Sequence, residues 1–386
     1  MKTLLIRRYL LKVHLYLGLI LGGAFALLGL TGSFLVFYPE IDRGLNPELV
    51  NPSAMHSPPS VQAWFDHLHA QFPERKGAWR IEIPRSSDQV VFARYLKPEE
   101  TDPDIFKPMV VALDPNSGAV LNARMWGDYL VTWVYDLHYA LLMGKSGTVL
   151  VSLLGMALLV SVLLGVYLWL PRGKQRFVKA IPKVRSGSKK AIYDIHSYTG
   201  AYGAVLLLLM IVTGVGLATP QWVEPLVNLF SVRMDKQTVY SSVPMPGTKR
   251  ITADQAVSVG LAVFPTAKLR WIEAPIKVED VYVLRLQQPA EPSQRFPKTF
   301  VWIDQFSGQV LASRDALKVN SGDAFFDWLH PLHNGEALGL TGRILAFVSG
   351  LLPLALFLTG WIRFRQKRNA KGIADQKQAL KHCSVD

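Results

Sequence analysis

Cysteine is almost absent from this sequence of 386 residues, in which Cys383 is the only one. A single thiol excludes intramolecular disulfides, iron–sulfur clusters and zinc sites built from several thiolates. The sequence also contains no C-x-x-C-H segment, which excludes the attachment site of a thioether-linked haem. Any metal or redox chemistry of this chain must therefore use other ligands.

Acidic residues are also scarce, since 29 Asp and Glu stand against 42 Lys and Arg for a net charge of +13. Much of the basic excess lies in three short segments that flank apolar runs, and the positive-inside rule places these segments in the cytoplasm. Because these residues bracket apolar runs, they indicate membrane topology and not nucleic-acid binding. The basic residues are Lys2, Arg7, Arg8, Lys12, Arg172, Lys174, Arg176, Lys179, Lys183, Arg185, Lys189, Lys190, Arg363, Arg365, Lys367, Arg368, Lys371, Lys377 and Lys381.

Half of the residues are apolar, and four apolar segments are long enough to cross a bilayer. The predicted spans are 13–37, 138–170, 193–219 and 338–362. The mixed polar segments 40–130 and 221–325 are predicted to lie outside the cytoplasm, and segments 1–12, 171–192 and 363–386 inside it. We therefore expect a multi-pass membrane protein of the membrane α+β class, with a four-helix bundle and both termini in the cytoplasm.

Two histidine motifs each occur twice. His14 and His196 are both followed by Tyr at +2, Gly at +4 and Thr-Gly at +17 and +18. His138 and His333 are both followed by Gly at +6, +9 and +27. The repeat predicts two parallel halves, each of the form span, polar module, span. Such halves would be related by a pseudo-twofold axis along the membrane normal.

The two polar segments carry matching patterns as well. Each contains a stretch of helical periodicity, followed by strand-like runs and a turn of the form Asp-x-x-Ser-Gly. The turns Asp114–Gly118 and Asp304–Gly308 predict β-hairpins in which glycine supplies a positive φ. We expect one small α+β module in each half.

The four repeated histidines predict two haem sites. Parallel halves place His14 and His196 at one depth near the cytoplasmic face, and His138 and His333 at another near the outer face. Imidazoles from facing helices of a bundle can supply both axial ligands of a haem iron. We therefore predict two haem b groups with bis-histidine ligation. A single interfacial histidine is more often only a polar residue, but histidines inside a membrane are by default functional.

Four further residues are candidates at these sites. His330 lies three residues before His333, so either could be the ligand of the outer haem. Only His333 has the three repeated glycines. His330 is then a swapped ligand, a supporting group or a residue at the substrate. Tyr16 and Tyr198 are predicted to hydrogen-bond near the inner haem, or else to be interfacial aromatics. Arg343 points into a span and needs a partner, for which we expect a propionate of the outer haem.

The repeated module resembles a PepSY domain, and the whole pattern resembles the PepSY-associated transmembrane family. The motifs are His14-x-x-x-Gly18 with Thr31-Gly32, Asp194-Ile-His196 with Thr213-Gly214, and Leu332-His333-Asn-Gly335 with Gly339 and Gly342. Members of this family include iron-regulated inner-membrane proteins encoded with siderophore uptake systems. Similarity to that branch, and especially to ferrioxamine-linked siderophore reductases, implies a bacterial di-haem enzyme. It would reduce Fe(III) siderophores, hydroxamates among them, to Fe(II) in the periplasm.

The resemblance also implies partners. Some relatives carry a fused flavin and nicotinamide reductase domain that this sequence lacks, so we expect a separate protein, a reduced flavin or a quinol as electron donor. The other expected partners are the ferric siderophore and the lipid bilayer, with no nucleic acid. One alternative is a non-redox PepSY protein that binds or inhibits an extracytoplasmic partner. A transporter is a second alternative, which the lack of acidic residues within the apolar cores disfavours.

Overall fold

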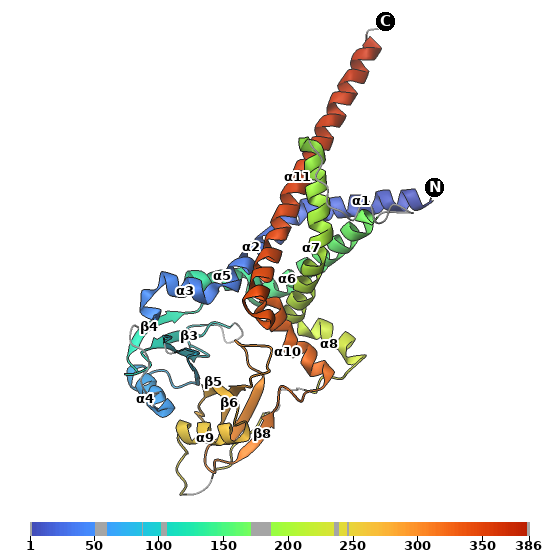
Figure 1. Cartoon of the computed structure of the whole chain (residues 1–386). Coiled ribbons are helices and arrows are strands. Elements are labelled where there is room, and N and C mark those ends of the chain that lie inside the picture. The colour runs from blue at the N-terminus through green and yellow to red at the C-terminus, as the bar shows by residue number, and fades with distance from the viewer. Residues whose placement is uncertain are drawn as a thin grey trace.

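The computed structural model describes residues 2–50, 60–86, 88–101, 106–170, 187–234, 239–244 and 247–383. The protein consists of a helical bundle and a sheet domain that lies at one end of it (Figure 1). The C-terminal part of the described chain extends past the other end of the bundle, and the N-terminal part points sideways from the bundle near that end. The basic residues predicted between positions 172 and 185 lie outside the described residues.

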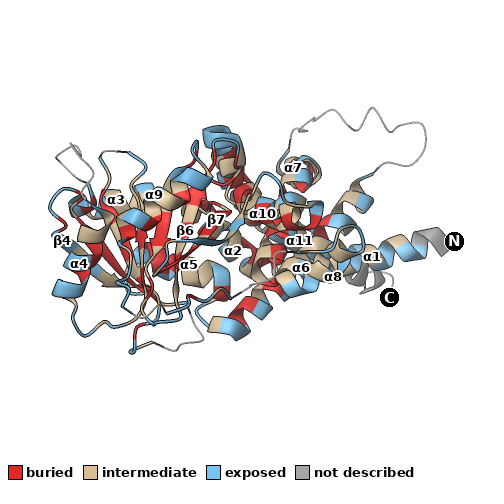
Figure 2. Cartoon of the chain, turned by 90° about the horizontal axis from the view of Figure 1, so that it is seen from below, coloured by how far each residue is buried: buried red, intermediate tan, exposed pale blue. Residues whose placement is uncertain are grey.

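Apolar helices form the bundle. Within the described residues, three are long and apolar enough to cross a membrane, and a bent pair makes up to a fourth span. The bundle contains α6 (Gly144–Trp169), α7 (Ser188–Ala218), α11 (Gly339–Cys383), and the bent pair α1 (Lys2–Ile20) and α2 (Gly22–Val36). Much of the bundle surface is tan or pale in Figure 2, and many of its exposed side chains are large and apolar. Such a surface suits lipid, and the chain is a multi-pass membrane protein.

The bend between α1 and α2 is a feature that the apolar run 13–37 does not reveal. The two helices meet at an angle of 59°. Gly22 and Gly23 follow the break at once, and glycine is a poor helix former that commonly accompanies kinks. The third predicted span, in contrast, lies in the single helix α7. The bent pair α1 and α2, which is the first span of the first half, therefore differs in shape from α7, the first span of the second half.

Eight antiparallel strands make one sheet in the order β4-β3-β2-β1-β5-β6-β7-β8. Strands β1 and β5 pair in the middle, with Ile81 opposite Ile272. The two segments that the sequence predicts as separate modules therefore share a sheet. The strands are β1 (Trp79–Glu82), β2 (Val91–Tyr95), β3 (Met109–Leu113), β4 (Val120–Met125), β5 (Lys268–Glu273), β6 (Val281–Gln287), β7 (Thr299–Asp304) and β8 (Val310–Arg314).

Two helices cover one face of the sheet. Helices α4 (Val61–Gln71) and α9 (Ala253–Val263) supply apolar side chains to a core that includes Trp64, Ile81 and Leu284. Alternate strand residues point into this core, which leaves the opposite face free for polar side chains. The predicted hairpins at Gly118 and Gly308 are confirmed, because both glycines have a φ of +71° between paired strands.

Short elements connect the sheet domain to the bundle. They are α3 (Tyr38–Leu45), η1 (Pro47–Leu49), α5 (Leu130–Ala140), α8 (Pro220–Asn228), α10 (Ser321–His333) and η4 (Glu336–Leu338). An ion pair of 2.9 Å between Arg124 of β4 and Asp42 of α3 fixes one of these connections. Helices α5 and α10 matter most here, because they carry His138 and His333 to the sheet side of the bundle.

Candidate functional site

The four repeated histidines meet as two pairs. His14 of α1 faces His196 of α7 with 6.4 Å between the ring centres, and we name these the tail-side pair. His138 of α5 faces His333 of α10 with 6.2 Å between the ring centres, and we name these the sheet-side pair. Each pair takes one histidine from each half of the chain.

The spacing within each pair suits two imidazoles on one metal ion. A bond from imidazole nitrogen to a metal is about 2 Å long, so two rings on opposite sides of one ion have centres roughly 6.2 Å apart. The observed separations are 6.2 and 6.4 Å. Within the described residues, no group of three or more His, Cys, Asp or Glu side chains could hold a metal ion. The spacing of the rings in each pair fits bis-histidine ligation, as in a haem b site.

In the sheet-side pair, both Nδ1 atoms bond to a neighbouring helix. His138 Nδ1 lies 3.0 Å from the carbonyl oxygen of Leu28 and 3.1 Å from Thr31 Oγ1, both on α2. His333 Nδ1 lies 2.9 Å from Thr213 Oγ1 on α7. Thr213 Oγ1 donates its own hydrogen to the carbonyl of Leu209 at 2.6 Å, so it accepts from His333.

The tail-side pair repeats this arrangement with other helices. His14 Nδ1 donates to the carbonyl oxygen of Ser161 on α6 at 3.0 Å. His196 Nδ1 lies 2.9 Å from Thr359 Oγ1 on α11. Thr359 Oγ1 donates to the carbonyl of Ala355 at 2.7 Å, so it accepts from His196.

These contacts fix the tautomer of all four rings. A carbonyl oxygen, or a hydroxyl whose hydrogen is already donated, can only accept, so Nδ1 carries the hydrogen in each histidine. Nε2 then keeps its lone pair and can bind a metal ion. Metal-ligating histidines in proteins almost always have such a partner on the other ring nitrogen. All four imidazoles are thus in the tautomer that can bind a metal ion through Nε2.

A glycine lies against each of the four rings. A Cβ atom added at Gly32 or Gly214 would lie 2.9 or 3.0 Å from Cε1 of His138 or His333. One added at Gly165 or Gly360 would lie 3.2 or 3.4 Å from Cε1 of His14 or His196. These are the +18 and +27 glycines of the sequence repeats. Their spacing therefore reflects the close approach of each imidazole to a neighbouring helix.

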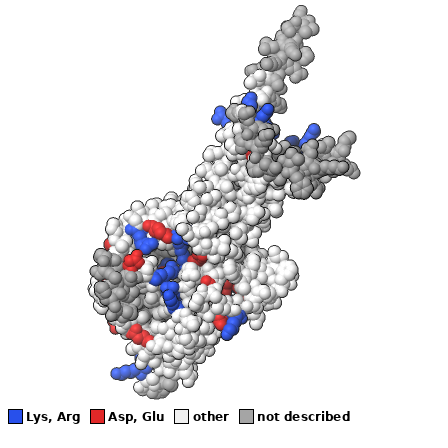
Figure 3. Space-filling model, viewed as in Figure 1, with Lys and Arg blue, Asp and Glu red and all other residues white. Residues whose placement is uncertain are grey.

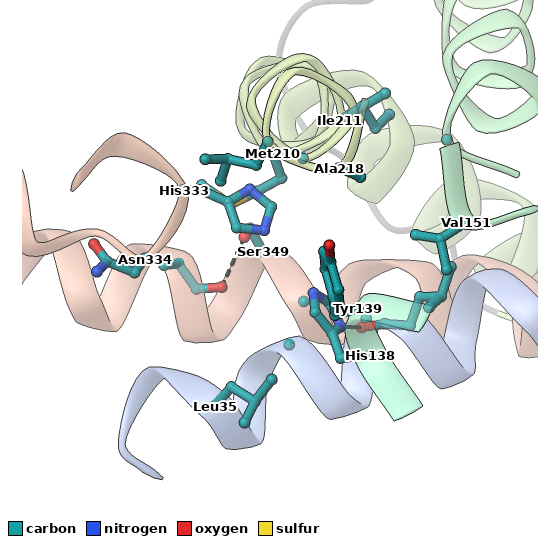
Figure 4. A pocket seen from close by; sticks show the side chains of 18 of the residues that line it. Leu35, His138, Tyr139, Val151, Met210, Ile211, Ala218, His333, Asn334 and Ser349 are labelled. Atoms are coloured by element: carbon teal, nitrogen blue, oxygen red, sulfur yellow. Dashed lines mark hydrogen bonds between the residues drawn. The ribbon is translucent and has the colours of Figure 1, made fainter. Parts of the chain in front are cut away.

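A cavity of about 350 Å³ surrounds the sheet-side pair (Figure 4). Apolar residues of α2, α6, α7 and α11 make up most of its wall. Its polar lining includes His330, Asn334 and Arg295. An apolar cavity of this kind between helices is a common place for a flat cofactor.

His333 and not His330 is the partner of His138. The His330 ring packs on Phe296 with 4.1 Å between ring centres, and Asn334 Nδ2 donates to His330 Nδ1 at 3.1 Å. His330 still lines the cavity, so it lies close to the sheet-side pair without opposing His138. His333, which has the repeated glycines at +6, +9 and +27, is thus the histidine that faces His138.

Of the three other candidates, Arg343 has a different partner from the one that the sequence suggests. Arg343 Nη2 forms an ion pair of 2.7 Å with Glu40, and its guanidinium lies over Phe37, so its partner is a carboxylate of this chain. Tyr16 is 57% exposed on the bundle surface, as expected for an interfacial aromatic. Tyr198 stacks on Tyr202 with 6.3 Å between ring centres.

Two supporting residues escaped sequence reasoning. Thr359 precedes Gly360 and so repeats the Thr-Gly dipeptide of positions 31–32 and 213–214, which is a signal that could have found it. Ser161 is not part of such a dipeptide, although both its backbone carbonyl and its Oγ lie within hydrogen-bond distance of His14 Nδ1, at 3.0 and 3.3 Å.

A comparison with protein families agrees with this membrane architecture. Residues 11–367 match the model of the PepSY-associated TM region. The match covers nearly the whole chain, including all four paired histidines. No curated protein matches the chain significantly.

Proposed function

The chain belongs to the PepSY-associated TM region family, and on that premise we propose that it is a di-haem b reductase of the bacterial inner membrane. It would take electrons on the cytoplasmic side and reduce ferric siderophores on the periplasmic side. The observation that carries this proposal is the two facing histidine pairs, in which every Nδ1 is engaged and every Nε2 is left for a metal.

The tail-side and sheet-side pairs would each hold one haem. Bound haem would supply one-electron chemistry that protein side chains lack. The chain itself positions the four imidazoles, fixes their tautomers through Thr213, Thr359 and backbone carbonyls, and surrounds the sheet-side pair with mostly apolar side chains.

Charge supports the proposed orientation. Basic residues near both chain ends lie at the tail side of the bundle, which the positive-inside rule assigns to the cytoplasm. The sheet domain would then lie in the periplasm. The strand order is symmetric about β1 and β5, and each histidine pair draws on both halves, which supports a pseudo-twofold axis along the membrane normal.

Reduction alone is sufficient chemistry for release of the metal. One electron from a separate donor converts Fe(III) to Fe(II), and the hard oxygen ligands of a siderophore hold Fe(II) far less well. The donor would be a cytoplasmic protein, a reduced flavin or a quinol. No general acid, base or nucleophile is required of the chain.

An absorption spectrum tests this function. The purified protein is expected to show a b-type haem spectrum, with two haems per chain by a haemochrome assay. After reduction, the spectrum should reoxidise when a ferric siderophore is added. A colourless preparation would contradict the proposal and favour a non-redox binding protein. If the protein contains haem but no ferric chelate reoxidises it, the proposed substrate is wrong. The proposal that the protein transfers electrons would still stand.

Thr213→Val should weaken the sheet-side haem site without changing its shape. The substitution removes the oxygen that accepts from His333 Nδ1 at 2.9 Å. Loss of such a supporting partner typically lowers metal affinity by about 10- to 100-fold. Haem titration of the depleted protein measures the effect. Thr148→Val is a matched control, because Thr148 is also buried but donates to the carbonyl of Gly144 within its own helix. Equal haem affinity in the two variants would exclude the assigned role.

A further inference from the structure

Arginine is concentrated on the sheet face that α4 and α9 leave uncovered. Eight arginines lie on this face or at its edge. Arg124 and Arg314 pair with Asp42 and Asp327, and the other six have three carboxylates near them. These six arginines are Arg80, Arg85, Arg94, Arg270, Arg285 and Arg295, and the three carboxylates are Glu82, Glu273 and Glu336. Figure 3 shows a strip of Lys and Arg side chains in a hollow of the sheet domain. The face therefore carries an excess of positive charge.

Two of these arginines are neutralised within the sheet. Arg80 forms an ion pair of 2.6 Å with Glu273, and Arg94 forms one of 2.7 Å with Glu82. Glu336 is occupied by the loop before β7, since it accepts from Ser293 Oγ at 2.7 Å and from the backbone nitrogen of Arg295 at 3.1 Å. Glu82 and Glu273 still lie close enough to Arg285 for their charges to interact with it, but neither forms an ion pair with it.

Arg285, Arg85 and Arg295 form no ion pair with the described residues. Arg285 lies between aromatic rings, 4.5 Å from the centre of Trp271 and 4.6 Å from that of Phe300. Its Nε atom is buried and has no hydrogen-bond partner among the described residues. Arg85 donates to the carbonyl of Gln294 at 2.7 Å, and Arg295 lies over the ring of Tyr38.

A buried cation without an ion-pair partner is costly for the fold. Burial and the neighbouring Arg80 lower the pKa of Arg285 to about 10, so the group still carries its charge at neutral pH. A bound anion would offset this cost. Guanidinium groups stacked on aromatic rings present a rigid fork that suits carboxylate and other oxyanions.

The arginines lead to the cavity at the sheet-side pair. Trp271, on which Arg285 stacks, contacts Phe296 with 5.7 Å between ring centres, and Phe296 contacts His330. Arg295 itself lines the cavity, and Arg85 is close enough to Arg295 for the two charges to interact. A ligand that contacts Arg295 would thus lie beside the proposed outer haem, whereas Trp271 and Phe296 separate Arg285 from the cavity.

We propose that Arg285, Arg85 and Arg295 bind anionic oxygen groups of the ferric chelate, so that the protein prefers negatively charged chelates, such as carboxylate or catecholate complexes, to cationic hydroxamates. This inference rests on the proposed reductase function. A haem propionate has the same carboxylate chemistry and could reach Arg295 in the cavity wall. Arg285 distinguishes the two sources, because it lies on β6 with Trp271 and Phe296 between it and the cavity.

Gallium(III) chelates separate binding from reduction, because Ga(III) resembles Fe(III) but is not reduced. Calorimetric titration of the purified full-length protein should show that gallium(III) citrate binds at least about tenfold more tightly than gallium(III) desferrioxamine B. Arg285→Gln should weaken citrate binding by about 10- to 100-fold, as expected for a charged hydrogen bond, and leave desferrioxamine binding unchanged. Arg75→Gln is the control, because Arg75 also lies over a ring, that of Tyr95, but pairs with Glu100.

Each other outcome is decisive. Equal affinity of the two gallium chelates, or unchanged citrate binding in Arg285→Gln, would overturn the proposal. Arg295→Gln, a loop variant, gives a second test if Arg285→Gln does not fold. If Arg295→Gln lowers the haem content and leaves citrate binding intact, Arg295 binds a haem propionate. Its assignment to the ferric chelate is then overturned. Charge-selective gallium binding by a protein without haem would support the anion site and contradict only the reductase function.

Discussion

Replacing His196 by alanine should lower the haem content from two per chain to one. The tail-side pair would lose an axial ligand, whereas the sheet-side pair uses other helices and should keep its haem. His14→Ala should give the same result, and His138→Ala and His333→Ala should each remove the haem of the sheet-side pair instead. A haemochrome assay of purified variants, with protein measured by amino-acid analysis, gives the ratio.

Two controls make this series specific. His69→Ala removes an exposed histidine of α4, far from both pairs, and should leave two haems. His330→Ala should also leave two haems, because His333 is the residue that faces His138. If His330→Ala loses a haem and His333→Ala does not, the pairing is wrong. If all four ligand variants retain two haems, the histidine pairs hold no haem.

The sequence predicted the pairing of the histidines because their repeats record physical contacts. The Thr-Gly dipeptides at positions 31–32 and 213–214 supply an Oγ1 atom beside Nδ1 and a glycine beside Cε1 of the opposing histidine. Each dipeptide stands 17 residues after a histidine of the tail-side pair and contacts a histidine of the sheet-side pair, so one span serves both pairs. Such a spacing is visible in a single sequence when the chain contains the unit twice.

Other features depend on partners that no spacing reveals. Arg343 was assigned to a propionate because an intramembrane arginine needs an anion, but Glu40 of α3 comes close enough to pair with it. The union of both modules in one sheet depends on β1 meeting β5 across almost 200 residues, and each strand alone is typical of a separate module. The bend of 59° at Leu21 lies within the apolar run 13–37, whose continuous hydrophobicity does not reveal it.

Gly29→Leu should disrupt the bundle more than any other single glycine change on α2. Helices α2 and α11 approach closely at this position, where a Cβ atom on Gly29 would clash with the backbone oxygen of Gly350. A backbone oxygen within a helix cannot move aside as a side chain can, so α11 would have to shift. Close helix contact through small residues is the usual basis of packing in membranes.

Both histidine pairs depend on this helix contact. Helix α2 carries the Thr31 and Leu28 atoms that bond to His138, and α11 carries the Thr359 atom that bonds to His196. We expect Gly29→Leu to destabilise the protein by roughly 3 kcal/mol, the upper part of the usual range for overpacking, and to lower haem content at both sites. Thermal unfolding in detergent and the haemochrome assay measure the two effects.

Gly23→Leu is the matched control, with the same change in the same helix. A Cβ atom on Gly23 would have nothing within 4 Å, so leucine there would project outward and cost little. The two leucines add the same apolar volume to α2 and differ only in what they meet. If both variants keep two haems and the same unfolding temperature, the contact between α2 and α11 does not set the geometry of either site. If Gly29→Leu alone fails, close backbone packing of these helices is what holds the imidazoles in place.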